Sequence, residues 1–206
     1  MIKFQLLFSH KLDYYKLYPA FLYACTFDNR GITMRIREAK LDDAKAIAKV
    51  QVDTWRTTYK TIVPDEYLEN MSYKNRASIW TRVIPQCYVY VAETDDGRIV
   101  GFASGGKAIN GEYDDYPGEL TAIYILKEYQ NQGIGKFLFE AVVKGIDALG
   151  YQSMIIFVLE DNPAKDFYKT MGGQLLDRVE IEIGGKMLYE LVYAWDDILG
   201  IITNAK

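Results

Sequence analysis

A glycine-bearing stretch at residues 130–136 (QNQGIGK) has the residue types and spacing that most directly suggest chemistry in this sequence. It follows a strand-like run at 119–126 and precedes a segment with apolar residues at helical spacing. The first turn of a helix exposes unpaired backbone N–H groups, and glycine lets a ligand approach the backbone closely. The stretch therefore predicts a phosphate or pyrophosphate site. A tight strand-to-helix connection is the alternative, and the spacing fits neither a dinucleotide fingerprint nor a P-loop.

Proton transfer in this chain must rely on tyrosines and carboxylates. The single histidine is His10, whereas there are 17 tyrosines and 28 acidic residues. The two cysteines, Cys25 and Cys87, exclude a disulfide scaffold and a thiolate zinc cluster, and we expect no metal site. Cys87 begins the strand-like run CYVYVAE with no histidine nearby. We therefore interpret it as a small apolar filler and not as a nucleophile.

The composition is typical of one soluble globular domain. The chain has 206 residues, half of them apolar and a quarter charged, which is enough for a single core and an appendage. A net charge of -4 gives no support for nucleic-acid binding. The longest uncharged stretch, 17–27, is too short to span a membrane, and charges interrupt any signal-peptide core. We expect a cytoplasmic protein with no nucleic-acid or membrane partner.

The first 33 residues differ from the rest in composition. They are rich in phenylalanine, tyrosine and leucine, and the regular patterning begins at Met34. We expect an N-terminal extension over 1–33 and one catalytic domain over 34–206. The residues before Met34 can be encoded with a bacterial ribosome-binding site, so one hypothesis is that translation starts at Met34. The alternative is a genuine N-terminal helix.

Apolar periodicity predicts alternating strands and helices over most of the remaining chain. The expected order is β-α-α-β-β-β-α-β-α-β-β, which indicates a mixed sheet with helices on both sides. The expected strands cover 34–38, 87–93, 99–104, 119–126, 153–159, 174–183 and 186–195. The expected helices begin near 41, 64, 73, 134 and 162.

Two motifs resemble those of the GCN5-related N-acetyltransferase (GNAT) superfamily. Gln130-x-x-Gly133-x-Gly135 matches its Gln/Arg-x-x-Gly-x-Gly/Ala signature, after a run similar to the family's central strand. Residues 162–173 (NPAKDFYKTMGG) look like its Asn to Phe-Tyr to Gly-Phe segment, with Gly173 where phenylalanine is usual. The resemblance covers Met34 to about Trp195. It is closest to the bacterial type that acts on small-molecule or peptide amines.

The resemblance implies an α/β fold with a mixed, mostly antiparallel sheet of six to seven strands, splayed at its centre, with helices on both faces. It implies acetyl-CoA as the acyl donor, without a metal. The splay would separate 119–126 from 153–159. The backbone amides of 130–136 would hold the pyrophosphate. The implied cofactor-binding residues are Ile123, Tyr124, Ile125, Gln130, Asn131, Gln132, Gly133, Ile134, Gly135, Lys136, Asn162 and Tyr168.

Acetyl transfer to an amine needs a base, because an alkylammonium is almost fully protonated at neutral pH. We choose Glu119 as this base. Period-2 alternation predicts that positions 119, 121, 123 and 125 share one face of the strand. If Ile123 flanks the thioester, Glu119 lies ~13 Å along the strand, so a water relay is required. A purely structural role for Glu119 at the strand start is the alternative.

The thiolate leaving group needs a general acid, and Tyr168 has a suitable phenol. The alternative is that Tyr168 only packs beside Phe167. For the thioester carbonyl, a backbone N–H near Ile123 would be a donor if the strand bulges there. Tyr168 and Glu119 are therefore the two expected catalytic residues.

In this family the acceptor usually enters opposite the cofactor, between the first helices and a later loop or hairpin. Trp55 and Tyr59 are one helical turn apart and face the same way, so we expect them to form an aromatic wall that holds the acceptor. Tyr116, on an acidic and aromatic loop, is a third expected substrate-binding residue. Packing in the core is the alternative for Trp55 and Tyr59. The acidic loop around Tyr116 is either a solvated surface or an attractor for a basic acceptor.

These inferences identify the chain as an N-acetyltransferase that moves an acetyl group from acetyl-CoA to a primary amine by direct attack in a ternary complex. A catalytically inactive CoA or acyl-CoA sensor of the same fold is the alternative. A nucleotide-binding module is a third class, and the 162–173 motif argues against it. Family members are often dimers, so a homodimer is an expectation. The acceptor's identity stays open among polyamines, antibiotics, amino acids and peptides.

Overall fold

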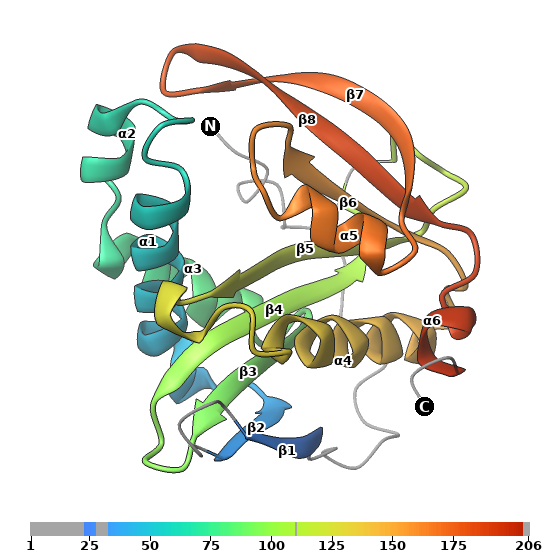
Figure 1. The fold of residues 1–206 in the computed structure, drawn as a ribbon, viewed down its shortest axis with the longest axis horizontal. Helices are drawn as coiled ribbons and strands as arrows, with labels where there is room; N and C mark the ends of the chain where they lie inside the picture. Colours follow the sequence, from blue (N-terminus) through green and yellow to red (C-terminus); the bar gives the residue numbers. More distant parts are fainter. Residues whose placement is uncertain (1–22, 28–32, 110, 204–206) are drawn as a thin grey trace.

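The computed structural model describes residues 23–27, 33–109 and 111–203. One sheet runs through the molecule in the order β1-β2-β3-β4-β5-β6-β8-β7 (Figure 1). The strands are β1 (Tyr23–Phe27), β2 (Thr33–Glu38), β3 (Tyr88–Thr94), β4 (Ile99–Lys107), β5 (Gly118–Ile125), β6 (Met154–Leu159), β7 (Gln174–Ile183) and β8 (Lys186–Trp195). All neighbouring strands are antiparallel except β5 and β6.

The helices lie where the periodicity predicts them, with ends shifted by a few residues. They are α1 (Ala44–Thr58), α2 (Asp65–Glu69), α3 (Tyr73–Val83), α4 (Ile134–Ala148), α5 (Lys165–Thr170) and α6 (Leu199–Thr203), with 3-10 turns at Leu41–Asp43 and Lys127–Tyr129. Only α6 was not expected. No helix within the described residues combines the length and apolar character needed to cross a bilayer.

Helices cover both faces of the sheet, as predicted. Trp80 of α3 packs its ring against Phe102 of β4, with centroids 4.8 Å apart. A Cβ at Gly105 of β4 would collide with Val142 of α4. Positions 102 and 105 lie on opposite sides of a strand, so α3 and α4 lie on opposite faces. Figure 1 shows α4 running alongside β4, below it in this view.

The expected mixed sheet with helices on both faces is confirmed, and the described sheet has one strand more than the expected six to seven. The additional strand, β1, comes from the expected N-terminal extension and pairs with β2 at the sheet edge. The alternative of an N-terminal helix over 1–22 falls outside the described residues.

The predicted splay lies between β5 and β6. These two strands pair only at Gly118 with Met154 and at Glu119 with Ile155. Beyond Glu119 they diverge, whereas β6 stays paired with β8 along its whole length. The remaining length of β5 therefore has a neighbour on its β4 side only.

A bulge in β5 corrects one expectation. Ser104 pairs with Ala122, and the next residue of β4, Gly105, pairs with Leu120, so Thr121 is an extra residue in β5. The expectation that 119, 121, 123 and 125 share one face is therefore wrong. Glu119 lies on the α1 and α3 face, together with Tyr124, which packs against Phe102. The extra residue shifts the alternation by one position beyond it.

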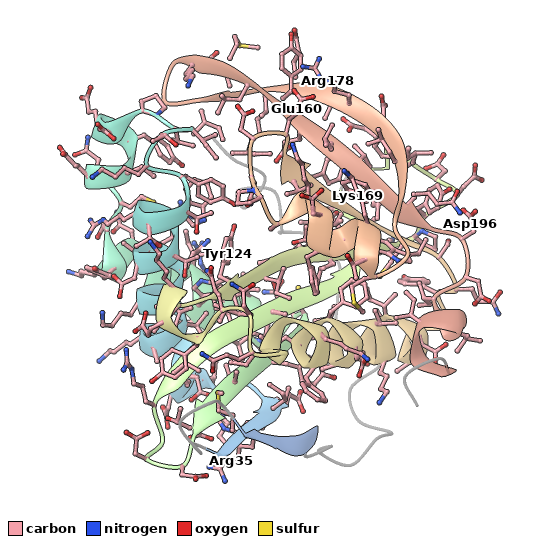
Figure 2. The ribbon with its side chains drawn as sticks, in the orientation of Figure 1. Arg35, Tyr124, Glu160, Lys169, Arg178 and Asp196 are labelled. Atoms are coloured by element: carbon pink, nitrogen blue, oxygen red, sulfur yellow. The ribbon has the colours of Figure 1, made fainter. Side chains whose placement is uncertain are left out.

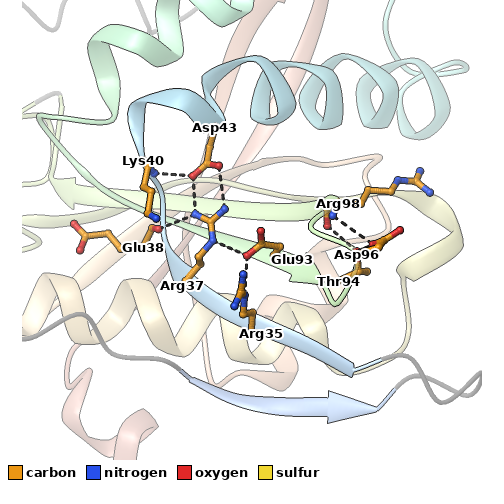
Figure 3. A network of polar contacts seen from close by, with 9 residues as sticks. All are labelled: Arg35, Arg37, Glu38, Lys40, Asp43, Glu93, Thr94, Asp96 and Arg98. Carbon is orange, nitrogen blue, oxygen red and sulfur yellow. Dashed lines mark hydrogen bonds and ion pairs between the residues drawn. The ribbon is translucent and has the colours of Figure 1, made fainter.

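A network of charges joins β2 and β3 to the start of α1 (Figure 3). Arg37 donates through Nε to Glu93 Oε2 at 2.7 Å and through Nη1 and Nη2 to the two oxygens of Asp43. Arg35 donates to the same oxygen of Glu93, also at 2.7 Å. These partners hold the pKa of Glu93 down, to about 2. The network fixes the position from which α1 runs towards the split in the sheet.

Candidate active site

A cleft of about 900 Å³ runs through the split between β5 and β6. The first turn of α4 lines one part of the cleft. Residues of α1, α3 and the β7–β8 hairpin line another part, which we call the acceptor end. The cleft brings together residues that lie far apart in the sequence. The predicted site residues that line it are Trp55, Tyr59, Glu119, Ile123, Tyr124, Ile125, Gln130, Asn131, Gly133, Gly135, Lys136, Asn162 and Tyr168.

The turn into α4 exposes its backbone to the cleft. Asn131 and Gly133 both adopt left-handed conformations, with φ of 59° and 82°. Gly133 is the N-cap residue of α4, and no side chain caps the helix there. In the described part of the chain, no hydrogen-bond acceptor faces the backbone N–H groups of Gly133, Ile134 or Gly135. These donors form a cradle suited to an anion.

Two glutamines shape this turn through their side chains. Gln130 donates from Nε2 to the carbonyl of Ile125 at 2.9 Å, and Gln132 donates from Nε2 to the carbonyl of Glu128 at 3.0 Å. Gln130 therefore ties the turn back to the end of β5. Gln132 and Ile134 do not line the cleft, and the Ile134 side chain is buried in the core. Only the backbone of these two residues is available to a ligand there.

The cationic side chains near the turn belong to Lys127 and Lys136, which both line the cleft. Lys136 Nζ lies 3.8 Å from Glu140 Oε1 on the same helix. A lysine in the first turn of a helix is repelled by the positive end of the helix dipole. A bound anion would offset this repulsion.

Three tyrosines from separate elements meet at the centre of the cleft. They are Tyr59 at the end of α1, Tyr124 of β5 and Tyr168 of α5. Asn162 donates from Nδ2 to the Tyr59 hydroxyl at 3.0 Å and accepts from the Ala164 N–H at 2.9 Å. Asn162 therefore holds the start of α5 against α1, in addition to lining the cleft.

Burial keeps these phenols neutral. It is the main cause that raises the pKa of Tyr168 far above its ordinary value, and the nearby Tyr124 raises it further. Burial likewise raises the pKa of Tyr59 and of Tyr124. A phenol that keeps its proton at neutral pH can donate it, so the site contains a proton donor.

Glu119 lies at the narrow end of the split, where β5 and β6 still pair. Its side chain is buried, and Oε2 accepts from the Ile109 N–H at 2.9 Å. Burial raises the pKa of the nearby Cys87 thiol, and the Glu119 carboxylate raises it further, to about 11. At that pKa Cys87 stays a thiol at neutral pH, which agrees with its interpretation as a filler.

The aromatic wall expected on α1 is present. The rings of Trp55 and Tyr59 have centroids 4.7 Å apart, and Tyr67 of α2 lies 6.0 Å from Trp55. Both residues also belong to an apolar cluster with Leu159 and Ile183, so the wall is packed and lines the cleft at once.

Tyr116, the third residue expected to bind the acceptor, does not line the cleft. Its hydroxyl donates to Asp196 at 2.7 Å, just after β8. Figure 2 shows Asp196 and Tyr124 on opposite sides of the molecule. The loop that carries Tyr116 follows β4 out of the sheet, so a position near Glu119 in sequence does not bring it to the cleft.

The sequence analysis missed several lining residues because they lie outside any motif. Arg76 of α3, Thr54 of α1 and Glu190 of β8 all line the acceptor end. Thr54 follows Gln51 by three residues on α1, so the two share a helix face. This spacing is the sequence feature from which Thr54 could have been predicted to line the cleft. Arg76 and Glu190 come close to the cleft only through tertiary packing.

Comparisons of sequence agree with this geometry. The profile of the acetyltransferase (GNAT) domain family matches residues 85–172. The uncharacterized N-acetyltransferase YuaI of Bacillus subtilis (strain 168) is 41% identical over 172 residues, which are 82% of this chain and 96% of that protein.

Solved structures show the same fold. The PaiA N-acetyltransferase of Thermoplasma acidophilum, in complex with coenzyme A, has a TM-score of 0.59 and 23% identity over 76% of this chain and 97% of its own. YncA of Salmonella typhimurium, solved with its cofactor acetyl-CoA, has a TM-score of 0.60 and 19% identity over 79% of this chain and 92% of its own.

Proposed function

This chain belongs to the GNAT family of N-acetyltransferases, and on that premise we propose that it transfers the acetyl group of acetyl-CoA to a primary amine by direct attack in a ternary complex. The observation that carries the proposal is the single cleft through the split sheet. It has a cradle of unpaired N–H donors at one end, a buried neutral phenol at its centre and a buried carboxylate beyond.

The α4 end of the cleft fits the pyrophosphate of CoA. The unpaired backbone N–H groups of Gly133, Ile134 and Gly135 would donate to it, and Lys127 and Lys136 would add positive charge. Beside the turn, the exposed backbone of Ile123 and Tyr124 would pair with the pantetheine arm as an added strand. The Ile125 carbonyl already accepts a hydrogen bond from Gln130, so we do not assign that oxygen to the pantetheine arm.

Glu119 would accept a proton from the acceptor amine through water. The bulge at Thr121 supports this role, because it turns Glu119 to the face on which Trp55, Tyr59 and Tyr124 lie. The carboxylate and the reacting centre lie on the same side of β5, with Thr121 and Ile109 beside them in the cleft.

Tyr168 would donate a proton to the departing CoA thiolate. The main support is its position in the cleft between α5 and β5, where a neutral phenol carries the proton that the thiolate needs. Asn162 acts as a positioning residue because it fastens the start of α5 to Tyr59.

The test is a thiol-release assay with acetyl-CoA and a panel of primary amines, run beside calorimetry with desulfo-CoA. Catalysis predicts amine-dependent release of CoA and a measurable affinity for the analogue. Binding without any transfer across the panel would contradict the proposal and indicate a CoA-binding sensor instead. No binding would contradict the assignment of the α4 turn.

A further inference from the structure

The acceptor end of the cleft carries an arginine that no part of the described chain satisfies. Arg76 lines the cleft from α3, and no described residue forms a hydrogen bond or ion pair with its guanidinium. Other arginines of the domain are engaged. For example, Arg56 donates to the carbonyls of Leu68, Glu69 and Met71, and Arg37 is held by two carboxylates.

The neighbouring polar groups of α1 are shielded from the cleft. Trp55 is 7% exposed and Thr54 is 4% exposed, and neither Trp55 Nε1 nor Thr54 Oγ1 is accessible to solvent. The Trp55 indole is a side-chain hydrogen-bond partner of Tyr124. Arg76 is therefore the cationic donor that this end of the cleft offers to a bound group.

Two side chains of opposite charge, Arg76 and Glu190, lie near Tyr124 at the acceptor end of the cleft. The charge of Arg76 lowers the pKa of Tyr124, and that of Glu190 on β8 raises it, so both reach the surroundings of this hydroxyl. Figure 2 shows Tyr124 rising from β5 towards α1. A cation from α3 and an anion from β8 therefore approach the site from different elements.

We infer that the acceptor is an amine that also carries an anionic group, such as the carboxylate of an α-amino acid. This inference rests on the proposed function and names its substrate class. The anionic group accepts from Arg76, while the amine lies towards Glu119. Trp55, Tyr59 and Ile183 contact the apolar part of the acceptor.

Charge matching favours this class over a polyamine. A polyamine has several cationic centres, and one of them would lie against the unpaired guanidinium of Arg76. The acidic loop near Tyr116, which suggested a basic acceptor in the sequence, is held towards β7 and β8 through Tyr113 to Asp177 and Tyr116 to Asp196. It adds no charge to the lining of the cleft.

The experiment compares three forms of each apolar L-amino acid: the acid, its amide and its decarboxylated amine. They are assayed for acetyl transfer with the wild type, Arg76→Gln and Lys74→Gln. Lys74 is the matched control, because it is an exposed cation on the same helix that does not line the cleft. Desulfo-CoA binding is measured for each variant to show that the donor end is intact.

We expect the wild type to prefer the acids, and Arg76→Gln to lower kcat/KM for the acids by about 10- to 100-fold while the amides change little. Lys74→Gln should alter neither. Arg76→Lys should restore part of the preference, because it keeps the charge but not the planar fork.

Equal losses for acids and amides in Arg76→Gln would overturn the inference, as would a wild-type preference for neutral amines or polyamines. Those results would leave the proposed acetyl transfer intact. An absence of transfer to every amine, with desulfo-CoA still bound, would instead overturn the proposed function and the inference together.

Discussion

At the scale of single residues, the central tyrosine can be separated from its packing role by removing one oxygen. Tyr168→Phe keeps the ring that contacts Phe167 and Tyr193, at centroid distances of 5.4 and 6.4 Å. We expect kcat to fall by ~10²–10⁴-fold, because the thiolate then leaves without its proton donor. Desulfo-CoA affinity, measured by calorimetry, should change little.

Tyr193→Phe is the matched control for this prediction. Tyr193 is as buried as Tyr168, its hydroxyl interacts with Lys169, and it lies outside the cleft. Its variant should keep full turnover. If Tyr168→Phe turned over as fast as Tyr193→Phe, Tyr168 would have no part in proton transfer.

Glu119→Gln tests the base in the same way. Glutamine still offers an oxygen to the Ile109 N–H, so the loop after β4 should stay in place. We expect kcat/KM for the amine to fall by ~10²–10⁴-fold at neutral pH, because the amide accepts no proton. Steady-state kinetics across pH measure this. A variant as active as the wild type throughout would leave Glu119 with a purely structural role.

At the scale of elements, the start of α4 distinguishes an anion site from a tight connection. A Cβ at Gly135 would meet Phe167 at 3.5 Å and Ile125 at 3.6 Å, which is ordinary contact. Gly135→Asp should raise the melting temperature, because glycine is lost and an acid in the first turn complements the helix dipole. The same carboxylate should weaken desulfo-CoA binding at least tenfold by repelling the pyrophosphate.

In this variant the melting temperature, measured by thermal unfolding, should therefore rise, while the affinity for desulfo-CoA, measured by calorimetry, should fall. Gly135→Ala is the control: it should match the gain in stability and lose much less affinity. If Gly135→Asp bound desulfo-CoA as tightly as Gly135→Ala, the turn would be a tight connection and the pyrophosphate would lie elsewhere.

The split between β5 and β6 is likewise a property of elements. Only two residue pairs join these strands, and all of β6 stays bound to β8. Parallel strands must be joined by a crossover connection, which here is α4 between β5 and β6. The first turn of α4 lines the cleft between these two strands. The same connection that closes the fold therefore places the N–H cradle beside the cleft.

At the scale of the whole molecule, the Arg37 network makes the free energy of unfolding depend on pH in the acid range. The guanidinium groups of Arg37 and Arg35 lower the pKa of Glu93 from 4.5 to about 2. A carboxyl whose pKa is lowered by folding contributes stability above its unfolded pKa. That contribution disappears as the pH falls from about 4.5 to about 2. The pKa of Asp43, which also binds Arg37, is lowered too, so it adds to the loss in acid.

Glu93→Gln should reduce the free energy of unfolding at pH 7 by ~1.5–3 kcal/mol, as expected for hydrogen bonds to a charged group. The difference from the wild type should shrink near pH 2, where Glu93 itself becomes protonated. Urea unfolding at both pH values measures this. Asp166→Asn, which removes an exposed pair with Lys169, should change stability by less than ~0.5 kcal/mol. A constant difference across pH would contradict the network's role.

The sequence by itself determined the elements of the domain, the turn at 130–136 and the segment that carries Tyr168. These features depend on local periodicity, glycine and capping chemistry, which act over a few residues. The aromatic pair Trp55 and Tyr59 belongs with them, because one helical turn sets its geometry. The domain boundary at Met34 and the roles of the site residues stay predictions.

Only the tertiary structure decided which side chains share the cleft. The one-residue bulge at Thr121 turned Glu119 to the face of Tyr124, and no local pattern announced it. Tyr116 went to Asp196 instead, while Arg76 and Glu190, distant in sequence, came to line the acceptor end. Strand register and the packing of remote elements place these groups, and neither is encoded in the spacing of neighbouring residues.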